Sequence, residues 1–408
     1  MRFLHSAFLK NVLVLFSGNF LFQLINIFSL IFLSRYYTPS IIGQYAVFLS
    51  VNTIISTCGT GRLEMAIMLP KKNEEAFNVF ISSFWIIVVI SLSTGFGAFS
   101  LFISGVLSDR VYLVYILPIS IFLSALSLLK IQFLNRLGKF KTISRGKIVS
   151  SSITAFIQIL SIYYYKNIIL IVVAFPFGLL FSNIYYYLEL KGNLNGSLFS
   201  MENIKQTLKK YRKFPLINNT SSLFNIIANQ GPVVLIEVVF GSSISGFYSV
   251  VQKTLNAPTS LIGMAFSQVY YKKIASESSE EKTKKFSRTT VKYFSLMSLP
   301  ILVVIILFSD YLYTMVFGDA YIISSRMAKI MIIFFLIRLI VVSQNTLFIA
   351  KGRLMLDLKF NVLYAISVLS PILLADYLNY NWMTTIILIT IFGTTTFLGL
   401  LYFILKNE

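Results

Sequence analysis

Residues 11–34 read NVLVLFSGNFLFQLINIFSLIFLS and contain no charged side chain. A helix of about 20 apolar residues crosses the roughly 30 Å hydrocarbon core of a bilayer. Similar windows follow at 36–61, 76–108, 111–129, 148–165, 167–188, 214–236, 238–271, 293–309, 330–350, 360–375 and 377–405. Lys253 interrupts the window at 238–271, and Arg338 interrupts the one at 330–350. The sequence therefore predicts an all-α polytopic membrane protein with twelve transmembrane helices.

The composition excludes soluble enzymes. Apolar residues make up 56% of the chain and charged residues only 12%, against about 25% in a typical soluble domain. The single Cys58 and single His5 provide neither an intrachain disulfide nor a His pair for a metal site or a catalytic triad. The chain also lacks a phosphate-binding GxxxxGK[ST] loop and the paired Asp motif of a metal-dependent glycosyl transferase. We therefore expect no enzymatic activity, no metal and no cofactor.

The net charge of +20 reflects membrane topology better than nucleic-acid binding. With the N-terminus inside, 25 Lys and Arg residues fall in cytoplasmic segments and five in outside segments. The positive-inside rule then predicts that both termini are cytoplasmic. The longest inside loop, 191–214, contains IKQTLKKYRKF and is expected to form a basic amphipathic helix on the anionic inner leaflet. It divides the chain into predicted lobes 1–190 and 215–408, each with six helices.

An internal repeat supports this division. At an offset of 203 residues, SIIGQYAV at 40–47 aligns with SISGFYSV at 243–250, which matches Gly43 with Gly246. The same offset matches Asn26 with Asn229. An offset of six helices keeps the orientation of each helix, so the repeats would be related by an axis along the membrane normal. We therefore expect two pseudo-symmetric six-helix lobes around a central cavity.

Polar residues form stripes along three of the predicted spans. Steps of three or four residues place them on one helical face. The stripes are Asn19, Gln23, Asn26 and Ser29; Asn218, Ser222, Asn225, Asn229 and, after an apolar Val233, Glu237; and Ser245, Ser249, Gln252, Asn256 and Ser260. Such side chains often join helices by hydrogen bonds. Because three stripes coincide with a lysine inside a span, Lys253, we favour a water-accessible cavity lined by them. Arg338, near the middle of its window, would add a second cation, unless it forms an ion pair with an acid.

Arg62 and Glu64 end the second span at its inner surface. Residues two apart on a helix do not face each other, so each is expected to need another partner. They are either interfacial anchors or residues with a role in binding substrate or protons. Glu64 and Glu237 are the candidate acids for ion coupling, although Glu237 alternatively lies at the outer interface.

Four stretches carry a resemblance to a known family. They are SRYYTPSIIGQYAVF (34–48), RLEMAIMLPKKNEEA (62–76), YRKFPL (211–216) and FGSSISGFYSVVQKTLNAPTSLIGMAFSQVYYKKI (240–274). In order and spacing they resemble bacterial O-antigen and oligosaccharide flippases of the polysaccharide-biosynthesis family, within the multidrug/oligosaccharidyl-lipid/polysaccharide exporter (MOP) superfamily. The family pattern usually has arginine where this chain has Lys253, which keeps the positive charge but not the bidentate phosphate geometry.

The resemblance implies transport of undecaprenyl-diphosphate-linked oligosaccharide repeat units. They would move from the inner to the outer leaflet of the bacterial inner membrane by alternating access, for assembly of O-antigen or capsule. Implied partners are this lipid-linked glycan, membrane lipids, a polysaccharide polymerase and a chain-length regulator. The expected cavity residues are Lys253, Arg338, Asn26, Asn229, Asn225, Gln252, Asn256 and Arg62.

Two other functions stay open at this point. A drug or cation exporter of the same superfamily would need acids, and not cations, deep in its cavity. A membrane-embedded polysaccharide polymerase would be expected to show a large outside loop or an intramembrane histidine, and the sequence has neither.

Overall fold

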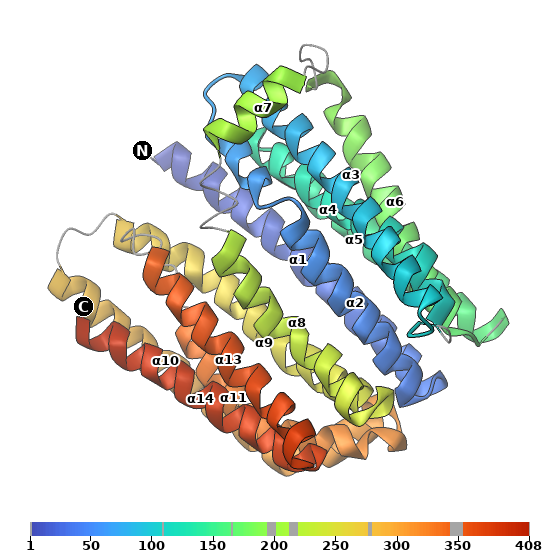
Figure 1. Ribbon diagram of the computed structural model, residues 1–408. Helices are drawn as coiled ribbons and strands as arrows, with labels where there is room; N and C mark the ends of the chain where they lie inside the picture. Colours follow the sequence, from blue (N-terminus) through green and yellow to red (C-terminus); the bar gives the residue numbers. More distant parts are fainter. Residues whose placement is uncertain are drawn as a thin grey trace. The chain divides into compact units, whose positions relative to one another are not determined.

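The computed structural model describes residues 2–107, 110–164, 166–193, 201–211, 219–275, 280–342 and 354–407. These residues form thirteen α-helices and no strand (Figure 1). The twelve long helices are α1 (Arg2–Tyr36), α2 (Pro39–Gly59), α3 (Asn73–Ile103), α4 (Val111–Arg136), α5 (Phe140–Tyr164), α6 (Ile168–Leu190), α8 (Asn219–Phe240), α9 (Ser242–Ala275), α10 (Glu280–Phe317), α11 (Ile322–Val342), α13 (Leu354–Leu378) and α14 (Trp382–Asn407). Within the described residues, ten helices are long and apolar enough to cross a membrane. The predicted all-α membrane fold is confirmed.

The helices extend beyond the predicted windows where their ends carry charge. Helix α5 begins at Phe140, before the window at 148–165, and α10 begins at Glu280, before the window at 293–309. A charge-free window marks only the part of a helix that lies in hydrocarbon, whereas the helix itself continues into water. Residues 343–350 of the tenth predicted span lie outside the described residues.

The chain packs as two compact units. The first contains residues 1–29 and 48–223, and the second contains residues 30–47 and 224–408. Helices α1 and α2 therefore each contribute to both units. The predicted lobes 1–190 and 215–408 follow the order of the chain, whereas packing assigns residues 30–47 to the second unit.

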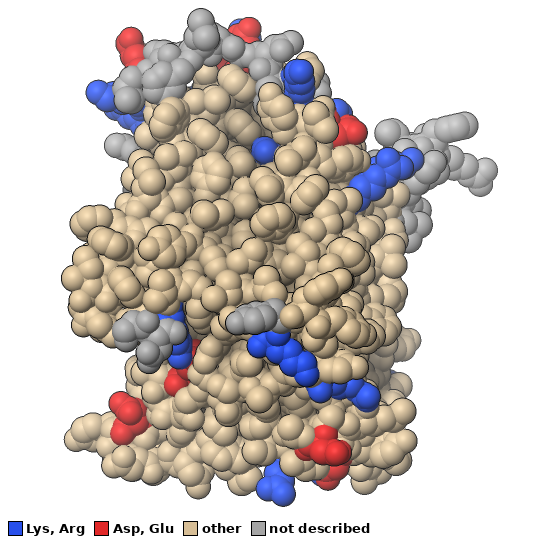
Figure 2. Space-filling model, turned by 90° about the vertical axis from the view of Figure 1, so that its right-hand side faces the viewer, with Lys and Arg blue, Asp and Glu red and all other residues tan. Residues whose placement is uncertain are grey.

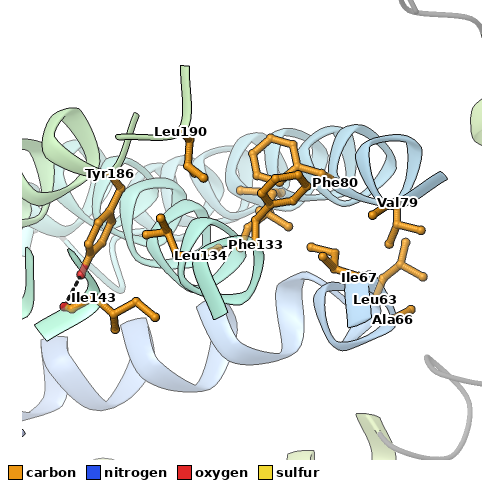
Figure 3. Close-up of a cluster of buried hydrophobic side chains, with 14 residues drawn as sticks. Leu63, Ala66, Ile67, Val79, Phe80, Phe133, Leu134, Ile143, Tyr186 and Leu190 are labelled. Carbon is orange, nitrogen blue, oxygen red and sulfur yellow. Dashed lines mark hydrogen bonds between the residues drawn. The ribbon is translucent and has the colours of Figure 1, made fainter. Parts of the chain in front are cut away.

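In the first unit, α6 packs against both α4 and α5, and α3 packs against α4. A hydrophobic cluster joins α3 and α4 to the 3₁₀ helix Leu63–Met68, and it includes Leu63, Phe80 and Phe133 (Figure 3). The Phe80 and Phe133 rings meet edge to face, with their centres 5.6 Å apart. This cluster fixes the turn that follows α2.

A short helix, α7 (Met201–Lys210), lies in the basic linker and packs against α3. Leu208 and Tyr211 pack against the hydrophobic cluster of the first unit, and Lys210 Nζ lies 3.1 Å from Glu75 Oε2. The helix is amphipathic as expected, but its apolar side contacts protein, whereas the sequence predicted contact with the inner leaflet. Residues 194–200 and 212–214 of the predicted linker lie outside the described residues.

In the second unit, α11 is the central helix, in contact with α9, α10 and α14. Phe334 of α11 packs against Phe397 of α14, with ring centres 5.7 Å apart. Arg35, at the end of α1, donates from Nε to the Val316 carbonyl at 3.0 Å and from a second nitrogen to the Met315 carbonyl, which satisfies the C-terminus of α10. Figure 2 shows a face of the molecule on which most side chains carry no charge, as contact with lipid requires.

Helices α2 and α9 meet within the second unit at two glycines. A Cβ on Gly43 would overlap the carbonyl oxygen of Ser242 and lie 2.9 Å from the Gly246 nitrogen. A Cβ on Gly246 would overlap the carbonyl oxygen of Pro39 and lie 3.1 Å from the Gly43 nitrogen. Gly43 and Gly246 are 203 residues apart, and so are Pro39 and Ser242, the first residues of α2 and α9. The contact is therefore reciprocal, as in a two-fold interface, and it joins two positions that the predicted repeat matches.

Candidate functional site

Asn229 is the centre of a hydrogen-bond network in the second unit. Its Oδ1 accepts from Arg338 Nη2 at 2.5 Å and from the Tyr364 hydroxyl at 3.4 Å. Its Nδ2 donates to the Asn225 carbonyl at 2.6 Å, and its own carbonyl accepts from Gln252 Nε2. Asn225 and Asn229 are one turn apart on α8, so one face of this helix meets α9, α11 and α13.

The network continues along α13. Asn225 Nδ2 donates to Asn361 Oδ1 at 2.9 Å, and Asn361 Nδ2 donates to Asp357 Oδ2 at 3.2 Å. Tyr364, one turn after Phe360, lies under the guanidinium of Arg338, whose Cζ is 5.8 Å from the ring centre. Arg338 is thus positioned by an amide and an aromatic ring from two other helices.

Within the described residues, Arg338 has no carboxylate within ion-pair distance. The sequence analysis left open that Arg338 forms an ion pair with an acid. Among the described residues this is wrong, because the guanidinium of Arg338 donates to the neutral side-chain amide of Asn229. The interhelical hydrogen bonds predicted as the alternative to a cavity are present at Asn225, Asn229 and Gln252. They hold the arginine without neutralising it.

Lys253 lies on α9, beside Gln252 but outside the hydrogen-bond network. It is half-buried, and its Nζ is 5.7 Å from the centre of the Tyr45 ring on α2. No carboxylate in the described residues forms an ion pair with it. A cation–π contact of this kind stabilises a positive charge without removing it.

The other predicted residues of the second unit lie apart from the network. Asn256 accepts from Thr259 Oγ1, at 2.8 Å through its carbonyl and 3.3 Å through its side chain. Glu237 is buried near the end of α8, and its Oε1 accepts from Ser242 Oγ at 2.7 Å. Glu237 therefore stabilises the corner between α8 and α9, and the alternative that it lies at the outer interface stays a prediction.

In the first unit, Arg62 and Glu64 contact each other, which corrects the prediction that they cannot. Helix α2 ends at Gly59, and Gly61 and Arg62 both have left-handed backbones, with φ of 59° and 57°. This turn brings Arg62 Nη1 to 3.7 Å from Glu64 Oε1. Glu64 is 2% exposed, and burial raises the pKa of its carboxyl above the ordinary value, an effect that Arg62 only partly offsets.

Asn26 lies on α1 in the first unit. It is exposed, and its Nδ2 donates to the Phe22 carbonyl of the same helix at 2.9 Å. Asn19, earlier in the same stripe, accepts from Lys147 Nζ at 2.8 Å. The stripe on α1 thus contacts α5 at Asn19, while Asn26 forms no bond to another helix among the described residues. Its pairing with Asn229 across a cavity stays a prediction.

The sequence missed a third cation, Lys130, which is 8% exposed in the first unit. Its Nζ donates to the Asn183 carbonyl at 3.0 Å and lies 5.9 Å from the Tyr187 ring centre. Lys130 directly follows the charge-free window at 111–129, but α4 continues past it to Arg136. The apolar residues between Lys130 and Arg136 are the signal that reveals this extension.

Comparisons with solved structures find the same fold in transporters. An inward-facing multidrug resistance MATE family transporter of the MOP superfamily is 15% identical, with 96% of this chain and 97% of that chain covered and a TM-score of 0.73. The lipid II flippase MurJ, in an inward closed conformation, is 14% identical, with 96% and 87% covered and a TM-score of 0.74. A MOP superfamily transporter from Pyrococcus furiosus, described as having a binding pocket of reverse polarity, is 14% identical, with 97% and 94% covered and a TM-score of 0.54.

Sequence comparison identifies the family. No protein with a curated function matches the chain. The family model described as polysaccharide biosynthesis protein matches residues 13–326, more than three quarters of the 408 residues. The structural neighbours share a membrane transporter fold with this chain. The chain therefore belongs to the polysaccharide biosynthesis protein family and has the fold of the MOP superfamily transporters.

Proposed function

We propose that this protein is a flippase for undecaprenyl-diphosphate-linked oligosaccharides. One observation carries the proposal: Lys253 on α9 and Arg338 on α11 lie in two predicted spans of one unit, and their partners among the described residues are neutral. Ionised residues inside a membrane protein are costly and mark functional sites. Two uncompensated cations favour an anionic substrate, and the family match points to a precursor of a polysaccharide.

The chemistry of such a substrate fits the residues around these cations. A diphosphate offers several anionic oxygens, which form strong charge-assisted hydrogen bonds with ammonium and guanidinium groups. Lys253 acts as a point charge, while Arg338 presents planar donors. Asn225, Asn229 and Gln252 supply amide groups of the kind that bind sugar hydroxyls. The lipid tail stays in the bilayer throughout, since only the polar head needs protein contacts to cross.

The membrane potential favours the proposed direction. With both termini in the cytoplasm, as the distribution of basic residues predicts, a diphosphate moves outward from an inside-negative compartment. Each charge gains about 2.3 kcal/mol per 100 mV when the protein moves no compensating charge. Ion exchange is then unnecessary for net transport. If protons or sodium are exchanged, Glu64 and Glu237 are the candidates, because they are the buried acids among the described residues.

Substitution of Lys253 tests the proposal. Lys253→Ala should abolish export of the surface polysaccharide while the protein still accumulates in the membrane. Lys253→Arg should retain export because the charge survives. Lys292→Ala is the matched control, since Lys292 is exposed on α10 and belongs to no part of the site. In purified protein, Lys253→Ala should weaken binding of undecaprenyl diphosphate about tenfold or more, the effect of losing one charge-assisted contact.

Normal export by Lys253→Ala would show that Lys253 is only a packing or snorkelling residue, whereas normal export by cells that lack the protein would refute the flippase. The remaining candidate in that second case is a cation exporter, a function consistent with the fold shared with the MATE transporter. Extrusion of a cationic dye separates the two functions. An exporter of cations should tolerate the loss of a positive charge near its path, and dye extrusion by Lys253→Ala should equal or exceed that of the wild type.

A further inference from the structure

The contact between Gly43 and Gly246 combines close approach with weak attachment. At this point the backbones of α2 and α9 touch, because neither glycine has room for a Cβ. In the described residues, no backbone hydrogen bond joins the two helices there. The neighbouring contacts of α9 are different: Ser245 Oγ donates to the Val233 carbonyl of α8 at 2.8 Å, and Ser324 Oγ of α11 donates to the Phe247 carbonyl at 3.1 Å. Helix α9 is thus hydrogen-bonded to α8 and α11, and it meets α2 at the two glycines and at the cation–π contact of Lys253 with Tyr45.

We propose that the Gly43–Gly246 contact is the outer seal of the transport path. This inference rests on the proposed function. Both glycines lie in the first two turns of helices that begin on the side opposite the basic loops, which the positive-inside rule assigns to the exterior. Lys253 follows Gly246 by seven residues, about 10 Å deeper along the helix. The seal therefore separates the exterior from the cation proposed to bind the diphosphate.

The geometry suits a seal that closes tightly and opens easily. Small residues allow two membrane helices to approach until their backbones touch, which leaves no room for water. Because neither glycine carries a side chain, the helices can part at this point without a change of rotamer at either position. The contact is reciprocal, so a displacement at Gly43 acts equally on Gly246 and on the carbonyls of Pro39 and Ser242. A side chain at either glycine would hold the seal open.

Cysteine labelling from outside the cell tests the seal. The reporter is Lys253→Cys in a Cys58→Ser background, treated in intact cells with a small membrane-impermeant methanethiosulfonate. Addition of Gly43→Ala or Gly246→Ala should raise the labelling rate about tenfold. The extra methyl group overpacks the closed contact, and the resulting loss of stability shifts the equilibrium from the closed to the open state by this factor. Gly97→Ala and Gly399→Ala are the matched controls, since no atom lies within 4 Å of a Cβ at either position. Both controls should label at the parent rate.

A second reporter cysteine detects labelling that is caused by unfolding. Val250 is fully buried on the same helix, and Val250→Cys should stay unlabelled in the Gly43→Ala background if the fold is intact. Labelling of Lys253→Cys at the same rate in Gly43→Ala, Gly246→Ala and the two controls would overturn the seal. The assay contains no substrate, so its result is independent of what is transported. Normal polysaccharide export in cells that lack the protein would refute the flippase while leaving the seal in place.

Discussion

Replacement of Asn229 by leucine should leave the charge of Arg338 without its side-chain hydrogen-bond acceptor. The leucine keeps the branched shape but removes the oxygen that accepts from Arg338 at 2.5 Å and the Nδ2 that donates to Asn225 at 2.6 Å. A hydrogen bond to a charged group contributes about 1.5–3 kcal/mol, and a neutral interhelical bond in a membrane about 0.6 kcal/mol. We expect the free energy of unfolding to fall by about 2–4 kcal/mol. Arg338→Met in the same background should recover about 1.5–3 kcal/mol, since both partners are then gone.

Unfolding in detergent micelles, followed by helix content, measures these differences. Asn26→Leu is the control, because the Asn26 amide is exposed and bonds only to its own helix. Its unfolding free energy should change by less than about 0.5 kcal/mol. Equal losses for Asn229→Leu and Asn26→Leu would show that the network contributes nothing to stability. If the losses of unfolding free energy in the single variants add up in the Asn229→Leu/Arg338→Met variant, the contribution of Arg338 to stability does not depend on Asn229.

Gly178→Ala should lower the unfolding free energy by about 1–3 kcal/mol, because its Cβ would overlap the Ser150 carbonyl oxygen. Gly97→Ala, measured in the same way, should be neutral or stabilising by up to about 1 kcal/mol; a loss equal to that of Gly178→Ala would exclude overpacking as the cause. Burial raises the folded pKa of Glu64 above the unfolded value, so its contribution is present below the unfolded pKa and is lost as pH rises through the folded pKa. Glu64→Gln should therefore become more stable relative to the wild type as pH rises above 4.5. If the difference in unfolding free energy between the two proteins stays constant with pH, the pKa of Glu64 is not raised.

The twelve long helices could be predicted because hydrocarbon excludes charge. Their ends could not, since charged residues continue a helix into water, as at Phe140 and Glu280.

The Arg62–Glu64 contact was missed for a local reason. Helical spacing was assumed, but Gly61 starts a left-handed turn that the neighbouring Arg62 also adopts. The cluster around Leu63 holds that turn, and such tertiary packing leaves no periodic signal in the sequence.

The candidate site was predictable in part. Lys253 and Arg338 stand out because each interrupts an apolar window, and the amides of α8 stand out by their spacing. Their partners depend on which helices are neighbours. Tyr364 reaches Asn229 across 135 residues, and Tyr45 approaches Lys253 from another part of the chain. Spacing within one helix carries no information about such contacts.

The reciprocal glycine contact also limits how the two halves of the chain can diverge. Where a half packs only against itself, its residues can change independently of the other half. At the contact, a side chain gained by Gly43 or by Gly246 strains both copies at once. Two helical turns further on this constraint is absent. The repeat offset of 203 residues matches Lys253 with Ser50, so the two copies differ in charge at this position. A duplicated scaffold can thus keep its symmetry where the copies meet and still acquire a charge in only one of them.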